Sequence, residues 1–300
     1  MWLKEPAGIN ETIRFLGTHE LCFYLVQGKD ALIIGGGMNH AAPALETQLH
    51  DIDIDSHRVK YLVVTHSHFD HCGAVPYLRR RFPDIEVLAT AASRDTLAKQ
   101  KVVDYNAKMN DLAAEQAGLG GECVPLEGQS DPFRIDRVVS EGDVVDLGKG
   151  VSAEFHAVPG HSKCCLATYV PGCRALFPTD TTPHPVNDWN DLAFPSAQYD
   201  FGSYVKSLRR LGEFDVEILG LDHHGVMLGA QAKEFLGLGL RRTLDFQQEV
   251  LRRYSVSKDL DEVARKTARE ALGKVKLQFI TEDLMFIITR AMIRNIVAGN

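Results

Sequence analysis

Several features that would place a protein in a membrane or outside the cell are missing from these 300 residues. No uninterrupted apolar run reaches the roughly 18 residues that a membrane-spanning helix requires. The start, MWLKEPAGIN, contains neither the apolar segment nor the small-residue cleavage site of a secretion signal. The six cysteines are scattered without a C-x-x-C pair, so they indicate neither a zinc ribbon nor a disulfide framework. We therefore expect no membrane segment, reduced thiols and a cytoplasmic location.

An excess of positive charge is missing as well. The chain has 33 Lys and Arg against 40 Asp and Glu, a formal net charge of −7. Nucleic-acid backbones bind to basic faces, and the run Arg79-Arg80-Arg81 at a predicted helix end is more typical of a solvated helix terminus. We expect a small-molecule substrate, no nucleic-acid partner, and a C-terminal segment that could support a homodimer.

The order of the predicted elements indicates a layered α/β fold. Short apolar and β-branched runs predict strands, and amphipathic runs predict helices. In the first part of the chain we expect strands at 12–16, 21–26, 31–34, 61–64 and 85–90, helices at 41–52 and 74–82, and a helical excursion at 92–118. In the second part we expect strands near 133–139, 151–158, 164–170, 174–178 and 217–221.

Three histidines and one aspartate lie close together in the segment HSHFDH, residues 66–71, which directly follows the apolar run YLVV. His66 and His68 point the same way in an extended segment, because strand side chains repeat every two residues. Asp70 and His71 follow at a predicted helix start and can face the same point. Three imidazoles and a carboxylate this close would be costly to bury unless a cation lay among them. The segment therefore predicts a metal site.

HSHFDH resembles the HxHxDH signature of the metallo-β-lactamase superfamily of hydrolases. The resemblance implies an α/β fold, a four-layer αββα sandwich, here with a C-terminal helical extension. It also implies further ligands where later strands end: His161 in the segment VPGHS, Asp180 after LFPT, and a histidine in LDHHG. The His-Gly pair typical of the family favours His224 as the last ligand, with His223 as the alternative.

Two departures from the family pattern stand out. Many members carry an Asp at the end of the second core strand, where this chain has Ile34 and then Gly35-Gly36-Gly37. The glycines are expected to let the backbone pass close to the site. Relatives usually have Gly before the bridging Asp, where this chain has Thr179.

The resemblance implies a dinuclear centre. One metal would be held by His66, His68 and His161, the other by Asp70, His71 and His224, with Asp180 bridging the two. Imidazole and carboxylate ligands suit divalent zinc first, with iron or manganese as alternatives. Two such ions would generate a hydroxide nucleophile at neutral pH and polarise a carbonyl group. Asp70 would also act catalytically by orienting that hydroxide.

Residues 230–300 differ from the rest by their helical periodicity and lack of a strand pattern. We divide the chain into a catalytic domain, 1–229, and a helical extension, 230–300. Ser257 and Thr281 are predicted helix N-caps, and one helix face is expected to carry Leu284, Ile287, Ile288, Ala291 and Met292. The extension either packs on the outside of the sandwich or roofs the metal cleft and shapes an apolar pocket. The isolated His156 and His184 are interpreted as structural rather than as pocket residues.

The expected activity is hydrolysis of a thioester or ester bond of the acyl-coenzyme A kind. Within the superfamily, the chain length, the glycine-rich strand end, the stretch HCGAVPYLRRRFPDIEVLAT and the helical tail resemble the 2-aminobenzoylacetyl-coenzyme A thioesterases. Alternatives on the same site are a lactonase or a phosphodiesterase. A flavodiiron-like oxidoreductase is a further alternative, although residues 230–300 are too few and too helical for the flavodoxin domain of such proteins. The remaining alternative is that the protein acts mainly by binding a partner and not by catalysis.

Overall fold

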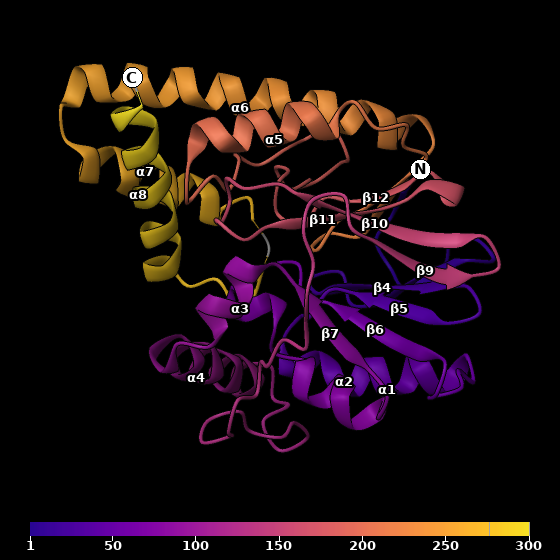
Figure 1. Cartoon of the computed structure of the whole chain (residues 1–300). Coiled ribbons are helices and arrows are strands. Elements are labelled where there is room, and N and C mark those ends of the chain that lie inside the picture. The colour runs from indigo at the N-terminus through magenta and orange to yellow at the C-terminus, as the bar shows by residue number, and fades with distance from the viewer. Residues whose placement is uncertain (276, 300) are drawn as a thin grey trace.

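The computed structural model describes residues 1–275 and 277–299, in which two β-sheets lie face to face between layers of helices (Figure 1). Two residues of the predicted extension, 276 and 300, lie outside this description. The four-layer αββα arrangement expected from the sequence is confirmed. No helix in the described part of the chain combines the length and the apolarity needed to cross a membrane.

The first sheet has the strand order β2-β3-β4-β5-β6-β7-β8. Its strands are β2 Ala7–Gly8, β3 Ile13–Gly17, β4 Cys22–Gln27, β5 Ala31–Ile34, β6 Val59–Val63, β7 Glu86–Ala89 and β8 Arg137–Val138. Strands β3, β4 and β5 are antiparallel neighbours, whereas β5, β6 and β7 run parallel. Because parallel strands end at one edge of a sheet, the loops after β5 and β6 lie next to each other, and the HSHFDH segment follows β6.

The second sheet has the strand order β1-β14-β13-β12-β11-β10-β9. Its strands are β1 Trp2–Leu3, β9 Val144–Gly148, β10 Val151–Ala157, β11 Leu166–Val170, β12 Ala175–Phe177, β13 Ile218–Gly220 and β14 Val226–Leu228. β11 is antiparallel to both β10 and β12, and β12 is parallel to β13. Strands β10, β12 and β13 therefore end at one edge, and each is followed by a segment that carries a predicted metal ligand.

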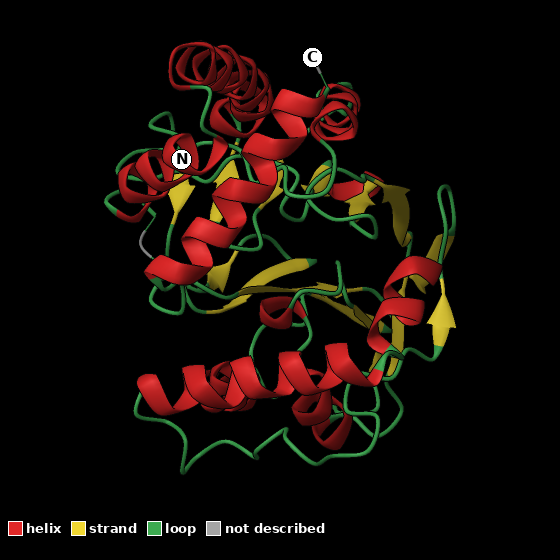
Figure 2. Ribbon diagram, turned by 90° about the vertical axis from the view of Figure 1, so that its left-hand side faces the viewer, coloured by secondary structure: helices red, strands yellow, loops and turns green. Residues whose placement is uncertain are grey.

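Helices cover the outer face of each sheet (Figures 1 and 2). On the side of the first sheet lie α1 Ala42–Asp51, α2 Val75–Arg81, α3 Ala91–Leu97 and α4 Gln100–Gln116. On the side of the second lie α5 Phe201–Leu211, α6 Ala230–Ser257, α7 Leu260–Leu272 and α8 Glu282–Ala298. Short 3-10 turns span η1 Asn39–Ala41, η2 Phe69–His71 and η3 Pro171–Cys173.

Burial on both faces of the sheets explains the apolar runs in the sequence. In β4, Phe23 and Leu25 face the core under α1 and α2, while the alternate residues Tyr24 and Val26 face the core between the two sheets. A third core packs α5, α6 and the C-terminal helices against the second sheet. Helix α6 shares this core with α5, so residues 230–300 are continuous in packing with the part of the chain before them.

Several element predictions need correction. The helical excursion at 92–118 is two helices, separated at Ala98 and Lys99. Ser257 is the last residue of α6 rather than an N-cap; Asp259 caps α7 by accepting hydrogen bonds from the backbone N–H groups of Asp261 and Glu262. Thr281 is confirmed as the N-cap of α8.

Candidate metal centre and its cavity

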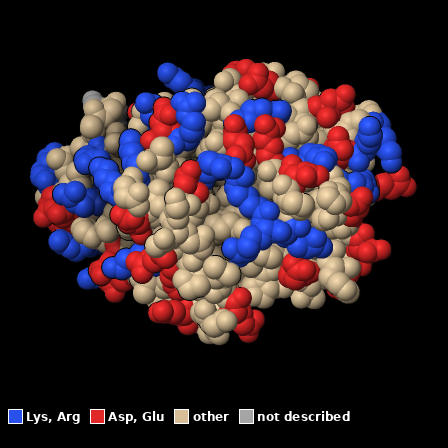
Figure 3. Space-filling view, turned by 60° about the horizontal axis from the view of Figure 1, so that its bottom comes forward, with Lys and Arg blue, Asp and Glu red and all other residues tan. Residues whose placement is uncertain are grey.

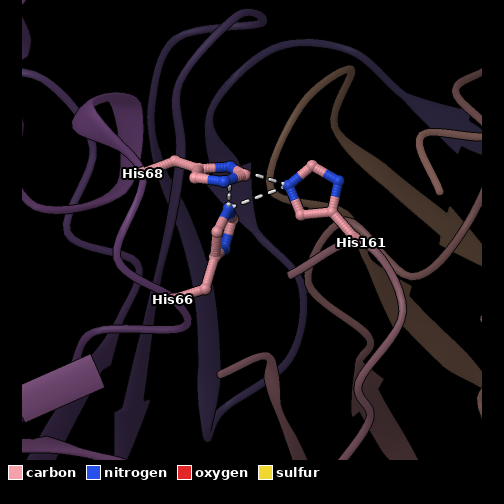
Figure 4. A group of neighbouring side chains, drawn as sticks. All are labelled: His66, His68 and His161. Atoms are coloured by element: carbon pink, nitrogen blue, oxygen red, sulfur yellow. Dashed lines mark hydrogen bonds between the residues drawn. The ribbon is translucent and has the colours of Figure 1, made fainter. Parts of the chain in front are cut away.

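Three imidazoles converge at the edge where β6 and β10 end (Figure 4). His66 Nε2 lies 3.1 Å from His68 Nδ1, and His161 Nε2 lies 3.1 Å and 2.9 Å from the same two atoms. Tetrahedral ligands at zinc–nitrogen distances of about 2.0–2.1 Å would be separated by roughly 3.3 Å. The three nitrogen atoms therefore have the spacing of ligands around one ion.

A second group lies beside the first. Asp180 Oδ2 is 3.4 Å from Nε2 of both His71 and His161, so its carboxylate stands between the two groups. Asp70 Oδ2 is 3.4 Å from His71 Nε2 and 3.6 Å from His223 Nε2. The residues that could hold a metal fall into three overlapping groups: His66, His68 and His161; His66, His71 and Asp180; Asp70, His71 and His223.

The outer nitrogen atoms of these rings are held by other parts of the protein. His161 Nδ1 donates to the Ser196 carbonyl at 2.7 Å, and His223 Nδ1 donates to the Glu20 carbonyl. His71 Nδ1 lies 3.0 Å from the Asp222 carboxylate, which also accepts a hydrogen bond from the Thr65 hydroxyl at 2.8 Å. In a neutral imidazole only one nitrogen carries a proton. When the three rings are neutral, as metal binding requires, their Nε2 atoms face the cluster as lone-pair acceptors, and a cation satisfies them where another acceptor cannot.

The charges of the site point the same way. Burial would raise the pKa of Asp180, but the imidazoles of His71 and His161 hold it well below its usual range. Burial lowers the pKa of His161 to about 3, although Asp180 opposes this shift. His71 differs, because Asp70 and Asp180 raise its pKa well above the usual value despite burial. A divalent cation between these groups would take the place of the proton that His71 otherwise carries.

The last predicted ligand, His224, lies apart from the other six. The structure places His223, not His224, beside Asp70 and His71. His224 has a left-handed backbone, φ 72°, and its Nδ1 lies 3.3 Å from His19 Nε2, outside the three groups. Its carbonyl accepts a hydrogen bond from the Trp2 indole at 2.7 Å, which fixes the turn.

A cavity of about 420 Å³ opens over the cluster. Its floor contains His68, Asp70, His161, Asp180 and His223. One side is formed by Thr96 of α3 and by residues of α4 such as Val102 and Tyr105. The opposite side, here called the roof, consists of Val275, Leu277, Ile280, Leu284, Met285, Ile287 and Ile288. A small-molecule ligand fits a volume of this order.

Comparison with known proteins decides the family of this chain. Residues 17–223 match the Metallo-beta-lactamase superfamily. The chain belongs to this superfamily. Its members are metal-dependent hydrolases, and membership confirms that the chain is an enzyme of this class.

Individual relatives are distant. Anaerobic nitric oxide reductase flavorubredoxin of Salmonella typhi is 24% identical over 216 residues, which is 66% of this chain and 39% of that protein. An archaeal metallo-beta-lactamase superfamily protein from Sulfolobus tokodaii has a TM-score of 0.58 at 21% identity, covering 77% of this chain and 86% of that one. A subclass B3 metallo-beta-lactamase of Bradyrhizobium japonicum has a TM-score of 0.57 at 16% identity, covering 84% and 95%. These structures show a shared fold, and the chain spans less than half the length of the flavorubredoxin.

Both departures from the superfamily pattern have a structural reason. A side chain at Gly36 would meet the His71 carbonyl oxygen at 2.1 Å, so glycine lets the loop after β5 pass the ligand segment, as expected. Thr179 has a left-handed backbone, φ 53°, which is costly for a β-branched residue. Its hydroxyl lies 3.1 Å from His66 Nδ1 and so orients that ring, a role that glycine could not fill.

The metallo-β-lactamase signature is also held from outside by α4. Asn106 Nδ2 donates to the Ser67 carbonyl at 3.1 Å, and Asn110 Nδ2 donates to the Phe69 carbonyl at 2.7 Å. Asn110 Oδ1 accepts from the Asn39 backbone N–H at 2.9 Å. The two asparagines are fully buried and four residues apart, so one face of α4 fixes the backbone between the predicted ligands.

Sequence reasoning missed several residues of the site. Asn106 and Asn110 are distant in sequence from every predicted ligand, so nothing in the sequence indicated them. Asp222 lies within the segment LDHHG, but no sequence pattern indicated that its carboxylate pairs with His71. His184 was interpreted as structural, yet it lines the cavity, with Nε2 3.6 Å from Asp180 Oδ1. His156 agrees with that interpretation, since its Nδ1 lies 3.0 Å from Glu141 outside the cavity.

The outer surface contrasts with the cavity. On the face shown in Figure 3, Lys and Arg side chains form a band across the middle, with Asp and Glu side chains around it. Arg79 of the predicted basic run pairs with Asp136 at 2.7 Å, and Arg81 pairs with Glu46 at 3.3 Å. These pairs reduce the basic character of the run.

Proposed function

We propose that this metallo-β-lactamase superfamily member hydrolyses a thioester or ester with the help of two divalent ions. The observation that carries the proposal is the convergence of five imidazoles and two carboxylates beneath an apolar cavity, whose floor contains three of these imidazoles and both carboxylates. Such a cavity accepts the acyl part of a substrate and brings its carbonyl group to the floor.

One ion would be held by His66, His68 and His161, and the other by Asp70, His71 and His223, with Asp180 between them. This set replaces the His224 of the sequence-based assignment by His223. Zinc is the first choice for such nitrogen and oxygen ligands, and iron or manganese are alternatives. When bound, the ions supply an acidified water and a Lewis acid for the substrate carbonyl.

The protein's own groups would position the reactants. Asp70 is ionised at neutral pH, because the imidazoles of His71 and His223 hold its pKa well below the usual range against the effect of burial. Its carboxylate can therefore accept a hydrogen bond from the attacking water and orient it. The apolar roof and the α4 side reduce the polarity of the surroundings above the floor, which strengthens the electrostatic contacts there.

The leaving group favours a thioester or an activated ester over an amide. A thiol has a pKa near 8.5 and can depart as the thiolate without a proton donor. An amine must be protonated as it leaves, and the described residues of the floor offer carboxylates held ionised and imidazoles directed at the ligand positions. The floor is therefore suited to substrates that need no strong general acid.

The test is a screen of metal-loaded protein against three substrate classes. Acyl-coenzyme A thioesters, acyl homoserine lactones and bis-nitrophenyl phosphate are compared at equal concentration, together with elemental analysis. Thioester turnover that rises with metal content is the expected result. Turnover of the phosphodiester alone, or thioester turnover in metal-free protein, would overturn the proposal.

A second candidate is redox chemistry at the same centre, because the curated relatives include flavorubredoxins. Such a protein would consume nitric oxide when loaded with iron and supplied with an electron donor. An electrode assay of nitric oxide consumption, with the zinc-loaded protein as control, separates the two candidates.

A further inference from the structure

We infer that the cavity is built for an uncharged apolar acyl group and discriminates against acyl groups that end in a carboxylate. The inference rests on the proposed function and names its substrate class. It depends on the walls of the cavity, which are distinct from the metal-ligating floor.

The walls are apolar over most of their extent. The roof contributes seven aliphatic or thioether side chains, and the loop between β12 and α5 adds Ala193, Phe194 and Pro195. Val102 of α4 faces them from the other side. Burying an aliphatic chain against such walls is favourable by about 0.8 kcal/mol for each methylene removed from water, or roughly a fourfold gain in affinity.

Lys and Arg side chains are missing from the part of this lining that the structure describes. Among the described residues that line the cavity, none is Lys or Arg, and the charged ones are Asp70 and Asp180 of the floor. A carboxylate carried to the far end of the cavity would lose its hydration and find no ion-pair partner there. It would also lie in the field of two ionised aspartates until metal ions offset them.

Two polar residues of the walls, Tyr105 and Gln198, carry no charge. Tyr105 lines the α4 side with its ring edge-on to Phe69 at 6.3 Å, and burial and then Asp70 raise the pKa of its hydroxyl. Gln198 lines the cavity, but its amide donates to the Ser196 hydroxyl at 3.1 Å. Neither group replaces the cation that a terminal carboxylate requires.

The roof is tied to the floor at one end. Phe279 packs its ring 6.0 Å from both Phe69 and His223, and the backbone N–H of Gln278 donates to Glu20 at 3.1 Å. From this anchor, α8 leads Leu284 and Ile288 along the cavity. This anchor sets the distance between the roof side chains and the metal ligands. The side chains of α8 therefore determine which acyl groups fit the cavity.

The test uses binding, so that it does not depend on turnover. Two ketones that cannot be hydrolysed are titrated by calorimetry into zinc-loaded and into metal-free protein: methyl octyl ketone and its counterpart with a carboxylate in place of the terminal methyl group. The metal-free titration decides, because bound zinc ions themselves attract a carboxylate. The apolar ketone is expected to bind at least about 30-fold more tightly, because an unpaired buried charge costs several kcal/mol. Equal affinity, or preference for the carboxylate, would overturn the inference.

Variants show whether the roof is responsible. Ile288→Lys places a cation in the half-buried wall and is expected to reduce the preference at least about tenfold. Val256→Lys is the matched control, because Val256 is 79% exposed on α6 outside the cavity, and it should leave the preference unchanged. Ile287→Lys, at a residue 62% exposed on the rim, gives a smaller shift in the same direction if Ile288→Lys does not fold. A preference that neither Ile288→Lys nor Ile287→Lys alters would overturn the role of α8.

Lys276 lies outside the described residues, so the titration is repeated with Lys276→Met, and the same preference is expected. A preference that changes by more than about tenfold in this variant would contradict the account of the lining. Failure of this inference is distinct from failure of the proposed function. Thioesters hydrolysed without discrimination would leave the function standing, whereas a preserved ketone preference without hydrolysis would leave the cavity assignment standing.

Discussion

The floor and the roof of the cavity are built by opposite kinds of contact. The imidazoles of His161 in the floor and of His71 beneath it are buried, and each is held by a polar partner outside the cluster. The roof side chains Leu284 and Ile288 are half-buried and contribute apolar surface. The difference indicates that the floor serves catalysis and the roof serves substrate preference. A substitution in the floor should change metal content and turnover together. A substitution in the roof should change substrate affinity alone.

The largest effect is expected from Asp180→Ala. The carboxylate lies between the two ligand groups, so its removal disturbs both, and His68→Ala removes a ligand of one. Hydrolysis should fall by at least about 100-fold in each variant, because several kcal/mol of transition-state stabilisation is lost. Metal content by elemental analysis should fall with it. Full metal content and turnover in both variants would contradict the view that the floor, unlike the roof, holds the metal ions.

The next largest effect, on metal affinity, is expected at Asp222, which contacts the predicted ligand His71 rather than the metal. Asp222→Asn keeps the volume but removes the charge that holds His71 Nδ1–H. We expect metal affinity, measured by chelator competition, to fall about 10- to 100-fold. Asp215→Asn, at an exposed acid paired with Arg174, is the matched control and should leave affinity unchanged. Equal affinity in both variants would show that the carboxylate does not tune the ligand.

A smaller effect is expected on stability at the back of the floor. Asn110→Ala leaves the Phe69 carbonyl and the Asn39 N–H without their partner in a fully buried position. The free energy of unfolding should fall by about 1–3 kcal/mol in denaturant titrations. Asn187→Ala is the control. It removes an exposed hydrogen bond to Asp191 and should change the free energy of unfolding by less than about 0.5 kcal/mol.

The smallest effect belongs to the roof. Ile288→Ala removes part of a half-buried apolar surface and should weaken binding of methyl octyl ketone about fivefold. Metal content should stay at the wild-type level, in contrast to every floor variant. A loss of metal in this variant would erase the distinction between the two regions.

Most of the predicted ligands could be found in the sequence because two signals coincide: a His or Asp residue, and a position directly after an apolar strand. The HSHFDH segment, His161 and Asp180 each follow an apolar strand, and the structure brings them together. The choice between His223 and His224 could not be made this way, because it depends on the left-handed backbone at His224 and on its contact with the distant His19.

The roof was harder to predict for a physical reason. Leu284 and Ile288 have the spacing of a core-facing helix stripe, and the same pattern serves a cavity wall. Ile287, assigned to that face, is 62% exposed at the rim. Of the two interpretations of residues 230–300, the lining of the cavity favours the roof, while the division at 229 stays a prediction because α5 and α6 share one core.

The central claim is that His223, rather than its neighbour, completes a centre for two ions. The most direct measurement is the number of bound ions per chain, by elemental analysis after dialysis, in the unmodified protein, His223→Ala and His224→Ala. The account predicts two ions, one ion and two ions in that order. An unmodified protein without bound ions, or a loss of metal in His224→Ala with none in His223→Ala, would contradict it.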